Sequence, residues 1–196
     1  LDRAALERSL GFTLRPRNVL VTFHPTTLDA TPPTEQFDAL GQALAALGPD
    51  VGVILTRPNA DGDGRALFER IDALVEAHPN MRAYTSLGQL RYLSAMAACD
   101  AVVGNSSSGL YEAPSLGRPT VNIGDRQRGR LQAASVLDCP PEASAIEATI
   151  RRAFTLSCAG VVNPYGDGHA AERIVAVLRG LPDPRALLQK RFFLLP

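Results

Sequence analysis

The sequence predicts an α/β protein built on a doubly wound, parallel, Rossmann-like sheet. Short apolar runs rich in Val, Ile and Leu alternate with longer segments whose apolar side chains recur every three or four residues. The runs are apolar almost throughout, which is typical of strands that helices cover on both faces. About six strands joined by right-handed crossovers follow from this alternation.

The first half of the chain is expected to hold an N-terminal amphipathic helix and then three strands, each followed by a helix. The strands are predicted at residues 18–23, 51–56 and 81–84. Thr34 and Glu35 can cap the helix after the first strand, and Thr85 with Ser86 can cap the helix over 87–99. The inward-facing side chains of that third helix are predicted to be Leu90, Leu93, Ser94 and Ala97.

The second half continues the same alternation. Strands are predicted at residues 101–103, 119–123 and 134–137. A helix is expected over 142–154, and a final helix is expected after the turn-forming sequence at 163–168. The apolar face of that final helix is predicted to contain Ala171, Ile174, Val175 and Leu178.

The stretch from 104 to 130 carries most of the functional information. After the strand at 101–103, Asn105 breaks the apolar run, and Ser106, Ser107 and Ser108 open a helix that can run to about residue 116. A strand that leads into a helix N-terminus leaves backbone N–H groups unpaired at the positive end of the helix dipole. Three hydroxyls add further donors, so this turn is suited to an anionic ligand.

Two further features of this stretch extend the predicted site. Glu112 follows the serines closely, where its carboxylate could accept hydrogen bonds from sugar hydroxyls. A loop after the next strand carries Arg126, Arg128 and Arg130. Together these groups predict a site for a phosphorylated sugar or a nucleotide. The alternative, an ordinary helix cap followed by a solvated basic loop, remains open at this stage.

His24 follows the first predicted strand and precedes a proline. Ligands of doubly wound sheets bind at the carboxyl ends of the strands, and Arg57, Asn105 and Gly124 are also predicted to lie there. An imidazole in that position could act as a general acid or base, or donate to a phosphate oxygen. A loop histidine with a purely structural hydrogen bond is the other interpretation.

The charge balance, the cysteine count and the absence of certain motifs exclude several classes of function. Twenty basic and twenty acidic side chains cancel, which argues against a partner such as nucleic acid or a membrane surface. The chain does not begin with Met, which indicates a piece of a longer protein. Three widely spaced cysteines fit reduced thiols in the cytoplasm. No metal-ligand spacing, P-loop or dinucleotide fingerprint is present, so neither a metal nor a cofactor is expected.

Five ordered motifs give the chain a family resemblance. They lie at residues 22–27, 57–61, 104–114, 121–130 and 163–168. Together they resemble the UDP-N-acetylglucosamine 2-epimerase family, and only its C-terminal domain, which is one half of a glycosyltransferase-B-type fold. The His-Pro-Thr-Thr sequence that starts at His24 is similar to the hydrolysing branch, which releases UDP and N-acetylmannosamine for sialic-acid synthesis.

The resemblance implies a role for each candidate residue. UDP would be eliminated across C1–C2 of the sugar, and water would then add to the glycal with inversion at C2. His24 would be catalytic or contact the leaving group, Ser106 and Ser107 would hold the diphosphate, and Glu112 would bind the ribose. The remaining UDP-binding residues would be Ser86 and Leu87 at the uracil, Arg126 near the phosphates or at the domain cleft, and Asn105 with Ser108.

The resemblance also implies a missing partner. The family's catalytic carboxylates belong to the N-terminal domain, so the chain by itself is expected to be inactive. Residues 1–180 are expected to form the UDP-binding domain, and the apolar tail at 181–196 is expected to pack on the absent N-terminal domain. A UDP-sugar ligand is expected, and a homo-oligomer is left open.

Two alternatives have a different function. One is a related glycosyltransferase-B-type enzyme that transfers a sugar or acts on another UDP-amino sugar, such as a diacetamido sugar. The other is a non-catalytic UDP-sugar sensor.

Overall fold

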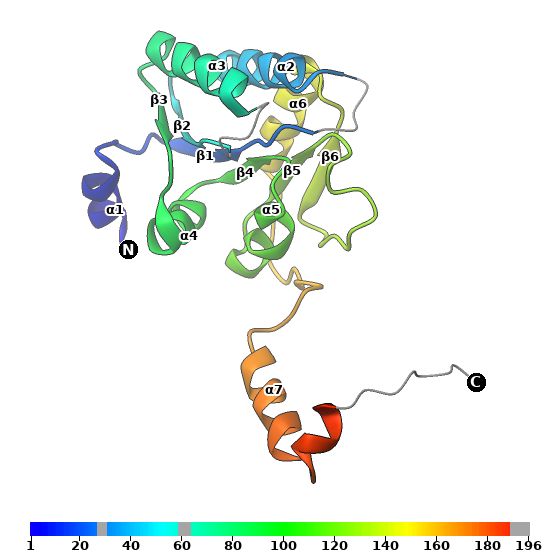
Figure 1. Cartoon of the computed structure of the whole chain (residues 1–196). Helices are drawn as coiled ribbons and strands as arrows, with labels where there is room; N and C mark the ends of the chain where they lie inside the picture. Colours follow the sequence, from blue (N-terminus) through cyan, green and yellow to red (C-terminus); the bar gives the residue numbers. More distant parts are fainter. Residues whose placement is uncertain (27–30, 59–63, 189–196) are drawn as a thin grey trace. The chain divides into compact units, whose positions relative to one another are not determined.

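The computed structural model describes residues 1–26, 31–58 and 64–188 (Figure 1). The chain divides into two compact units, Leu1–Pro164 and Tyr165–Pro196. The candidate site lies in the first unit.

The first unit is built on a six-stranded parallel sheet with strand order β3-β2-β1-β4-β5-β6. The fold class predicted from the sequence is therefore confirmed. The strands are β1 (Arg17–Thr22), β2 (Val51–Thr56), β3 (Met81–Tyr84), β4 (Ala101–Gly104), β5 (Thr120–Ile123) and β6 (Val136–Cys139).

Helices cover both faces of the sheet (Figure 1). One face packs against α2 (Pro33–Ala46), α3 (Gly64–Ala77) and α6 (Ala143–Ala153), and the other against α1 (Arg3–Leu10) and α4 (Gly88–Ala98). Strand residues alternate between the two cores: Val19 and Val21 join the first, and Leu20 joins the second. Burial on both faces explains why the strands are continuous apolar runs rather than alternating ones.

The strand order reverses direction between β1 and β4. Chain connections leave the sheet toward opposite sides at such a point, and a crevice forms beside the carboxyl ends of the strands. The last residue of β1, Thr22, lies opposite Thr56 of β2 on one side and Gly104 of β4 on the other. Gly104 has φ +132°, and a Cβ there would overlap the carbonyl oxygen of Thr22. Only glycine lets β4 leave the sheet in this way.

The serine-rich helix differs from its prediction. Instead of one helix to about residue 116, the structure has a four-residue helix α5 (Ser108–Tyr111) and then a 3₁₀ turn η1 (Ala113–Leu116). Pro114 explains the break, because it has no N–H to donate and its ring clashes with the preceding helical turn. The short helix contributes a much smaller dipole than the predicted one, so hydroxyl groups matter more at this site.

Three smaller predictions are also corrected. The last strand is β6 at Val136–Cys139, because a turn from Ala133 to Val136 occupies the predicted start. Helix α2 begins at Pro33 and has no side-chain cap, since proline itself favours the first helical turn. In α4, Leu90 is 65% exposed, and the buried face consists of Ser94, Ala95 and Met96.

The second unit contains helix α7 (Ala170–Arg179) and the 3₁₀ turn η2 (Pro184–Leu188). The predicted final helix is therefore present. None of its residues is buried, and Ile174 and Leu178 are exposed. The apolar tail from Phe192 to Leu195 lies outside the described residues, so its expected packing stays a prediction. Within the described ranges, no helix is long and apolar enough to cross a membrane.

Candidate functional site

A cavity of about 470 Å³ lies at the carboxyl ends of β1, β2 and β3. Four predicted site residues line it: His24, Ser86, Leu87 and Glu112. They come from three separate segments, and the parallel sheet brings them together because all of its strands end at the same edge. The remaining lining residues are Thr22, Thr56, Arg57, Thr85, Gly88, Gln89, Tyr92 and Leu93.

The backbone of His24 is held in place by Asn105. The Asn105 Oδ1 accepts the His24 N–H at 2.8 Å, and the Asn105 Nδ2 donates to the His24 carbonyl at 2.8 Å. Asn105 is 1% exposed. A buried amide that pairs with both backbone groups of one residue fixes the direction in which the chain leaves β1. The sequence placed Asn105 among ligand-binding residues, and the structure shows it connecting β4 to His24.

The carbonyl of Asn105 is itself fixed by the arginine loop. Arg126 Nη1 donates to it at 2.9 Å and Gln127 Nε2 at 2.6 Å. Burial lowers the pKa of Arg126, and the nearby charge of Arg130 lowers it further. Arg126 is thus a partly desolvated cation beside the turn that contains the serines.

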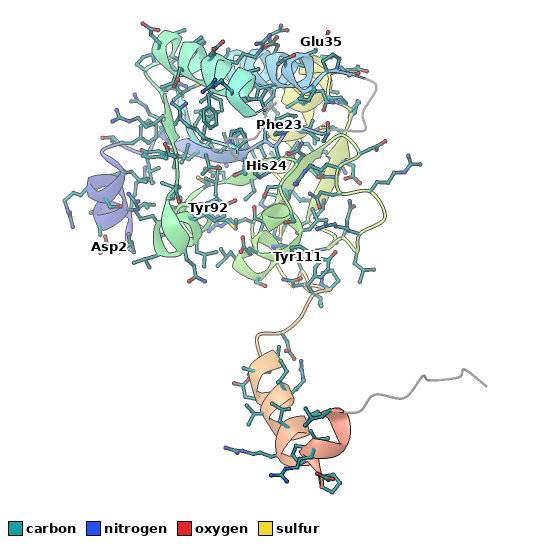
Figure 2. The ribbon with its side chains drawn as sticks, in the orientation of Figure 1. Asp2, Phe23, His24, Glu35, Tyr92 and Tyr111 are labelled. Atoms are coloured by element: carbon teal, nitrogen blue, oxygen red, sulfur yellow. The ribbon has the colours of Figure 1, made fainter. Side chains whose placement is uncertain are left out.

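A set of hydroxyl groups runs along the wall of the cavity. Tyr92 belongs to α4 (Figure 2). Its OH lies 2.6 Å from Ser108 Oγ and 3.3 Å from Thr22 Oγ1. Ser108 Oγ in turn donates to Ser106 Oγ at 3.2 Å. Ser107 is the residue before α5, and its carbonyl accepts from Leu110 and Tyr111, both at 2.9 Å. Of the three serines, Ser106 and Ser108 are therefore connected to the cavity through Tyr92.

Glu112 is the carboxylate that lines this cavity among the described residues. It follows α5, and burial raises the pKa of its carboxyl group. Its side chain is nevertheless accessible to solvent. A partly desolvated carboxylate accepts hydrogen bonds strongly, so Glu112 suits a ligand that presents hydroxyl groups.

The opposite wall is formed by the segment between β3 and α4. Leu87 is buried, and the carbonyls of Ser86 and Leu87 are engaged by Arg91, at 3.5 Å to its Nη2 and 2.8 Å to its Nε respectively. Arg57 also lines the cavity, as the sequence predicted for the carboxyl end of β2. Its guanidinium group donates a hydrogen bond to the Asp72 carboxylate, and its Cζ lies 5.3 Å from the ring centre of Phe68.

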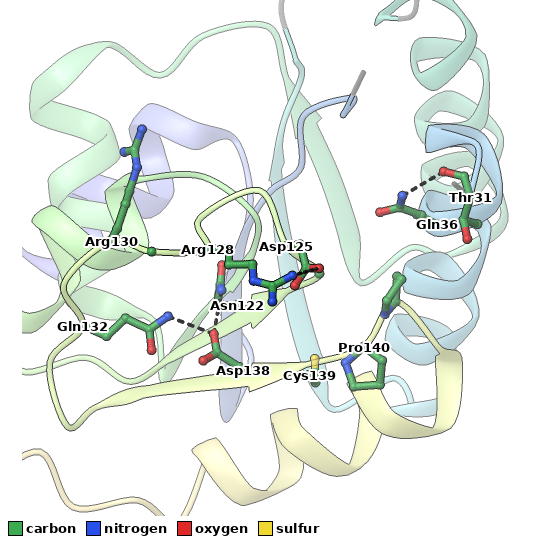
Figure 3. A pocket seen from close by; sticks show the side chains of 13 residues that line it. Thr31, Gln36, Asn122, Asp125, Arg128, Arg130, Gln132, Asp138, Cys139 and Pro140 are labelled. Atoms are coloured by element: carbon green, nitrogen blue, oxygen red, sulfur yellow. Dashed lines mark hydrogen bonds and ion pairs between the residues drawn. The ribbon is translucent and has the colours of Figure 1, made fainter. Parts of the chain in front are cut away.

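A second cavity of about 730 Å³ lies at the ends of β5 and β6 (Figure 3). Its polar groups are mostly paired with one another. Asp138 Oδ1 accepts from Asn122 at 2.7 Å and from Gln132 at 3.0 Å, and Arg128 lies 3.5 Å from Asp125. Gly124, another predicted strand-end residue, lines this cavity instead of the first one.

The first cavity has the composition of a binding site for a polar, anionic ligand. It combines an accessible carboxylate, an imidazole, hydroxyl groups and a nearby desolvated arginine. Sequence reasoning missed Tyr92, Thr22 and Thr56, because a tyrosine in an amphipathic helix and threonines in strands are ordinarily core residues. Their one sequence signal is that both threonines are the last residues of adjacent strands. Within the described part of the chain, no group of three or more His, Cys, Asp or Glu side chains could hold a metal ion.

Comparisons with known proteins identify the family of the chain. The family model for UDP-N-acetylglucosamine 2-epimerase matches residues 2–179. A hydrolysing UDP-N,N'-diacetylbacillosamine 2-epimerase from Legionella pneumophila is 30% identical over 188 residues, which is 96% of this chain and 49% of that protein. A polysialic acid biosynthesis protein from Escherichia coli is 31% identical, covering 100% of this chain and 50% of that protein.

Solved structures agree on the fold. The UDP-N-acetylglucosamine 2-epimerase of Methanocaldococcus jannaschii, crystallised with UDP-N-acetylglucosamine and UDP, superposes with a TM-score of 0.69 at 14% identity. The match covers 90% of this chain and 48% of that one. The first unit is therefore a Rossmann-like half of a glycosyltransferase-B-type fold. The chain spans about half the length of these curated relatives.

Proposed function

This chain belongs to the UDP-N-acetylglucosamine 2-epimerase family, and we propose that it is the UDP-binding domain of a hydrolysing enzyme that converts UDP-N-acetylglucosamine and water into N-acetylmannosamine and UDP. The observation that carries this proposal is the cavity shared by His24, Ser86, Leu87 and Glu112. The hydrolysing type is supported by the name of the Legionella relative, and a role in sialic-acid synthesis by that of the Escherichia coli relative.

The arrangement suits the departure of UDP. In the proposed elimination, the C2 proton is removed, its electron pair forms the C1–C2 double bond, and the C1–O electrons leave with the diphosphate. Negative charge then grows on the β-phosphate. Hydroxyl donors from Ser106 and Ser107 and the cation of Arg126 would stabilise that charge. Asn105 and Ser108 would act by holding His24 and Ser106 in position.

The other contacts would fix the nucleotide. Glu112 would accept the ribose hydroxyls, and the backbone at Ser86 and Leu87 would meet the uracil. His24 would then lie near the sugar–phosphate bond, where its imidazole can exchange a proton with the reacting groups.

One carboxylate does not make a full acid–base set. The base that removes the C2 proton would come from an N-terminal domain that completes the enzyme, so we propose that the chain alone binds UDP without releasing it from the substrate. The tail at 181–196 would pack on that domain. The complete enzyme would act in the cytoplasm on a free UDP-sugar, without nucleic acid, membrane or metal partners.

A second candidate substrate is a UDP-linked diacetamido sugar. The Legionella relative is named for UDP-N,N'-diacetylbacillosamine and matches nearly the whole chain. The two substrates share the UDP group, so the cavity described here would serve both of them. The sugar itself would be chosen elsewhere, where the N-acyl groups are contacted.

Calorimetry with this chain tests the proposal. UDP should bind, and Glu112→Ala should weaken it about tenfold or more, because a charge-assisted hydrogen bond contributes roughly 1.5–3 kcal/mol. Asp138→Ala removes a carboxylate from the second cavity and should leave UDP affinity unchanged. Absence of UDP binding at millimolar concentration, or equal loss in both variants, would contradict the assignment.

A further inference from the structure

Five side-chain hydroxyls form a continuous hydrogen-bonded series beside the first cavity, which we call the hydroxyl chain. Its members are contributed by β2, β1, α4, the first residue of α5 and the turn before α5. In order they are Thr56, Thr22, Tyr92, Ser108 and Ser106, and the successive O–O distances are 2.6, 3.3, 2.6 and 3.2 Å.

Each hydroxyl has one proton to donate, so the series can point in a limited number of ways. Ser108 Oγ gives its proton to Ser106 Oγ. The 2.6 Å contact between Ser108 and Tyr92 then requires Tyr92 to be the donor. Because the Tyr92 proton is used there, the bond with Thr22 requires Thr22 to donate. The whole hydroxyl chain therefore runs from Thr56 toward Ser106, and the Thr56 Oγ1 proton goes to Thr22 Oγ1 at 2.6 Å rather than to the Val21 carbonyl oxygen, which lies 3.4 Å away.

The end of the hydroxyl chain is an uncommitted donor. Ser106 Oγ accepts from Ser108 Oγ at 3.2 Å and from the Ser108 backbone N–H at 3.4 Å. Both of these contacts use its lone pairs, so its own proton must point elsewhere. In the described part of the chain no protein acceptor takes that proton. Phosphate oxygens are acceptors, so an anion at this turn would complete the series.

We propose that Tyr92 is a positioning residue that orients the hydroxyl chain, so that Ser106 presents its proton to a phosphate oxygen of the nucleotide. This inference rests on the proposed UDP-binding function and adds a residue to it. Hydrogen bonds that run in one direction polarise one another, so the last donor is stronger than an isolated serine hydroxyl. Tyr92 itself need not touch the ligand.

The surroundings of Tyr92 keep it a donor. Burial raises the pKa of its phenol, while the hydrogen bonds with Ser108 and Thr22 oppose that rise and the charge of Glu112 adds to it. The phenol therefore stays protonated at neutral pH. Phe could fill the same space but would supply no proton, and Ser108 could then turn its own hydroxyl away from Ser106.

The test compares two ligands that differ only in phosphate. Tyr92→Phe should weaken UDP binding roughly three- to tenfold, the range of one hydrogen bond, and leave uridine binding unchanged. Tyr84→Phe is the matched control: it removes a phenol that donates to the Leu10 carbonyl at 2.9 Å outside the hydroxyl chain. It should change neither affinity.

A double-mutant cycle identifies the route of the effect. Ser108→Ala cuts the chain between Tyr92 and Ser106, so it should lower UDP affinity selectively, and Tyr92→Phe added to it should cause little further loss. If Tyr92→Phe does not fold, Ser108→Ala alone still tests whether the hydroxyl chain contributes to UDP binding.

Three results would contradict the positioning role of Tyr92. Equal losses for uridine and UDP, or fully additive losses in the cycle, would overturn the positioning role of Tyr92. UDP binding by Tyr92→Phe at wild-type strength would do the same. A wild-type chain that binds neither ligand would instead remove the proposed function on which this inference rests.

Discussion

Two cavities open at the same edge of one parallel sheet, and they differ in how their polar groups are used. The larger one, at β5 and β6, has its carboxylates paired with amides or with Arg128. The smaller one, at β1 and β2, has an accessible Glu112 and a hydroxyl chain that ends in an uncommitted donor. Volume alone therefore does not locate a binding site. A carboxylate and hydroxyl donors that a ligand could reach are the better indicator, although the larger cavity also contains the unpartnered Oδ1 of Asn122.

The largest effect is expected from His24. In the two-domain enzyme that we propose, His24→Ala should lower kcat by about 10²–10⁴-fold, the usual range for a general acid or base, and change UDP affinity little. His78→Ala is the control, because that imidazole bonds to the Leu74 carbonyl at 3.1 Å, at the end of α3. Near-normal turnover with weaker UDP binding would reduce His24 to a binding residue.

Next in size is a change in stability that distinguishes the two cavities. Gly104→Ala should lower the free energy of unfolding by about 3 kcal/mol or more, since the new methyl group overlaps the Thr22 carbonyl in an unfavourable backbone conformation. Gly129→Ala, in the loop at the second cavity, has φ +81° but no atom within 4 Å of the new Cβ. It should cost only about 1–2 kcal/mol. Urea unfolding measures both, and equal losses would contradict the steric argument at β4.

The smallest effect concerns pH. Because burial raises the pKa of Glu112, its carboxylate should begin to protonate above the ordinary pKa of 4.5, and UDP affinity should fall as the pH is lowered through that range. Folding responds in the opposite sense: the raised pKa contributes stability at low pH that is lost as the pH rises through the folded-state pKa.

Glu112→Gln isolates this effect from the titration of the phosphate itself. The nucleotide phosphate titrates near pH 6 in both proteins, so calorimetric affinities are compared at matched pH values. Between pH 7 and the lowest pH at which both proteins remain folded, the wild type should lose about fivefold more UDP affinity than Glu112→Gln. This is the scale of one hydrogen bond to a charged group. Parallel pH profiles would show that the Glu112 charge does not contribute to binding.

Much of the site could be anticipated because it depends on strand ends. Once residues 18–23 and 101–103 are recognised as parallel strands, His24 and the serines must lie near one edge of the sheet. The break at Pro114 could also have been anticipated from the missing N–H. By contrast, nothing in the local sequence of α4 distinguishes Tyr92 from a core aromatic residue. The exposure of Leu90 was missed for the same reason, because helical periodicity fixes the spacing of a buried face but not its rotation.

The sequence by itself determined the parallel α/β sheet, the place of His24, Ser86, Leu87 and Glu112 at its carboxyl edge, and the resemblance to a family. These depend on apolar periodicity and on short motifs, which are local along the chain. Only the tertiary structure decided that Asn105 holds the backbone of His24, and that Thr22, Thr56, Tyr92 and the serines share one hydrogen-bonded series. Hydroxyl and amide groups select partners by distance and direction in space. Those partners lie up to 81 residues apart in this chain, and no local pattern encodes such pairings.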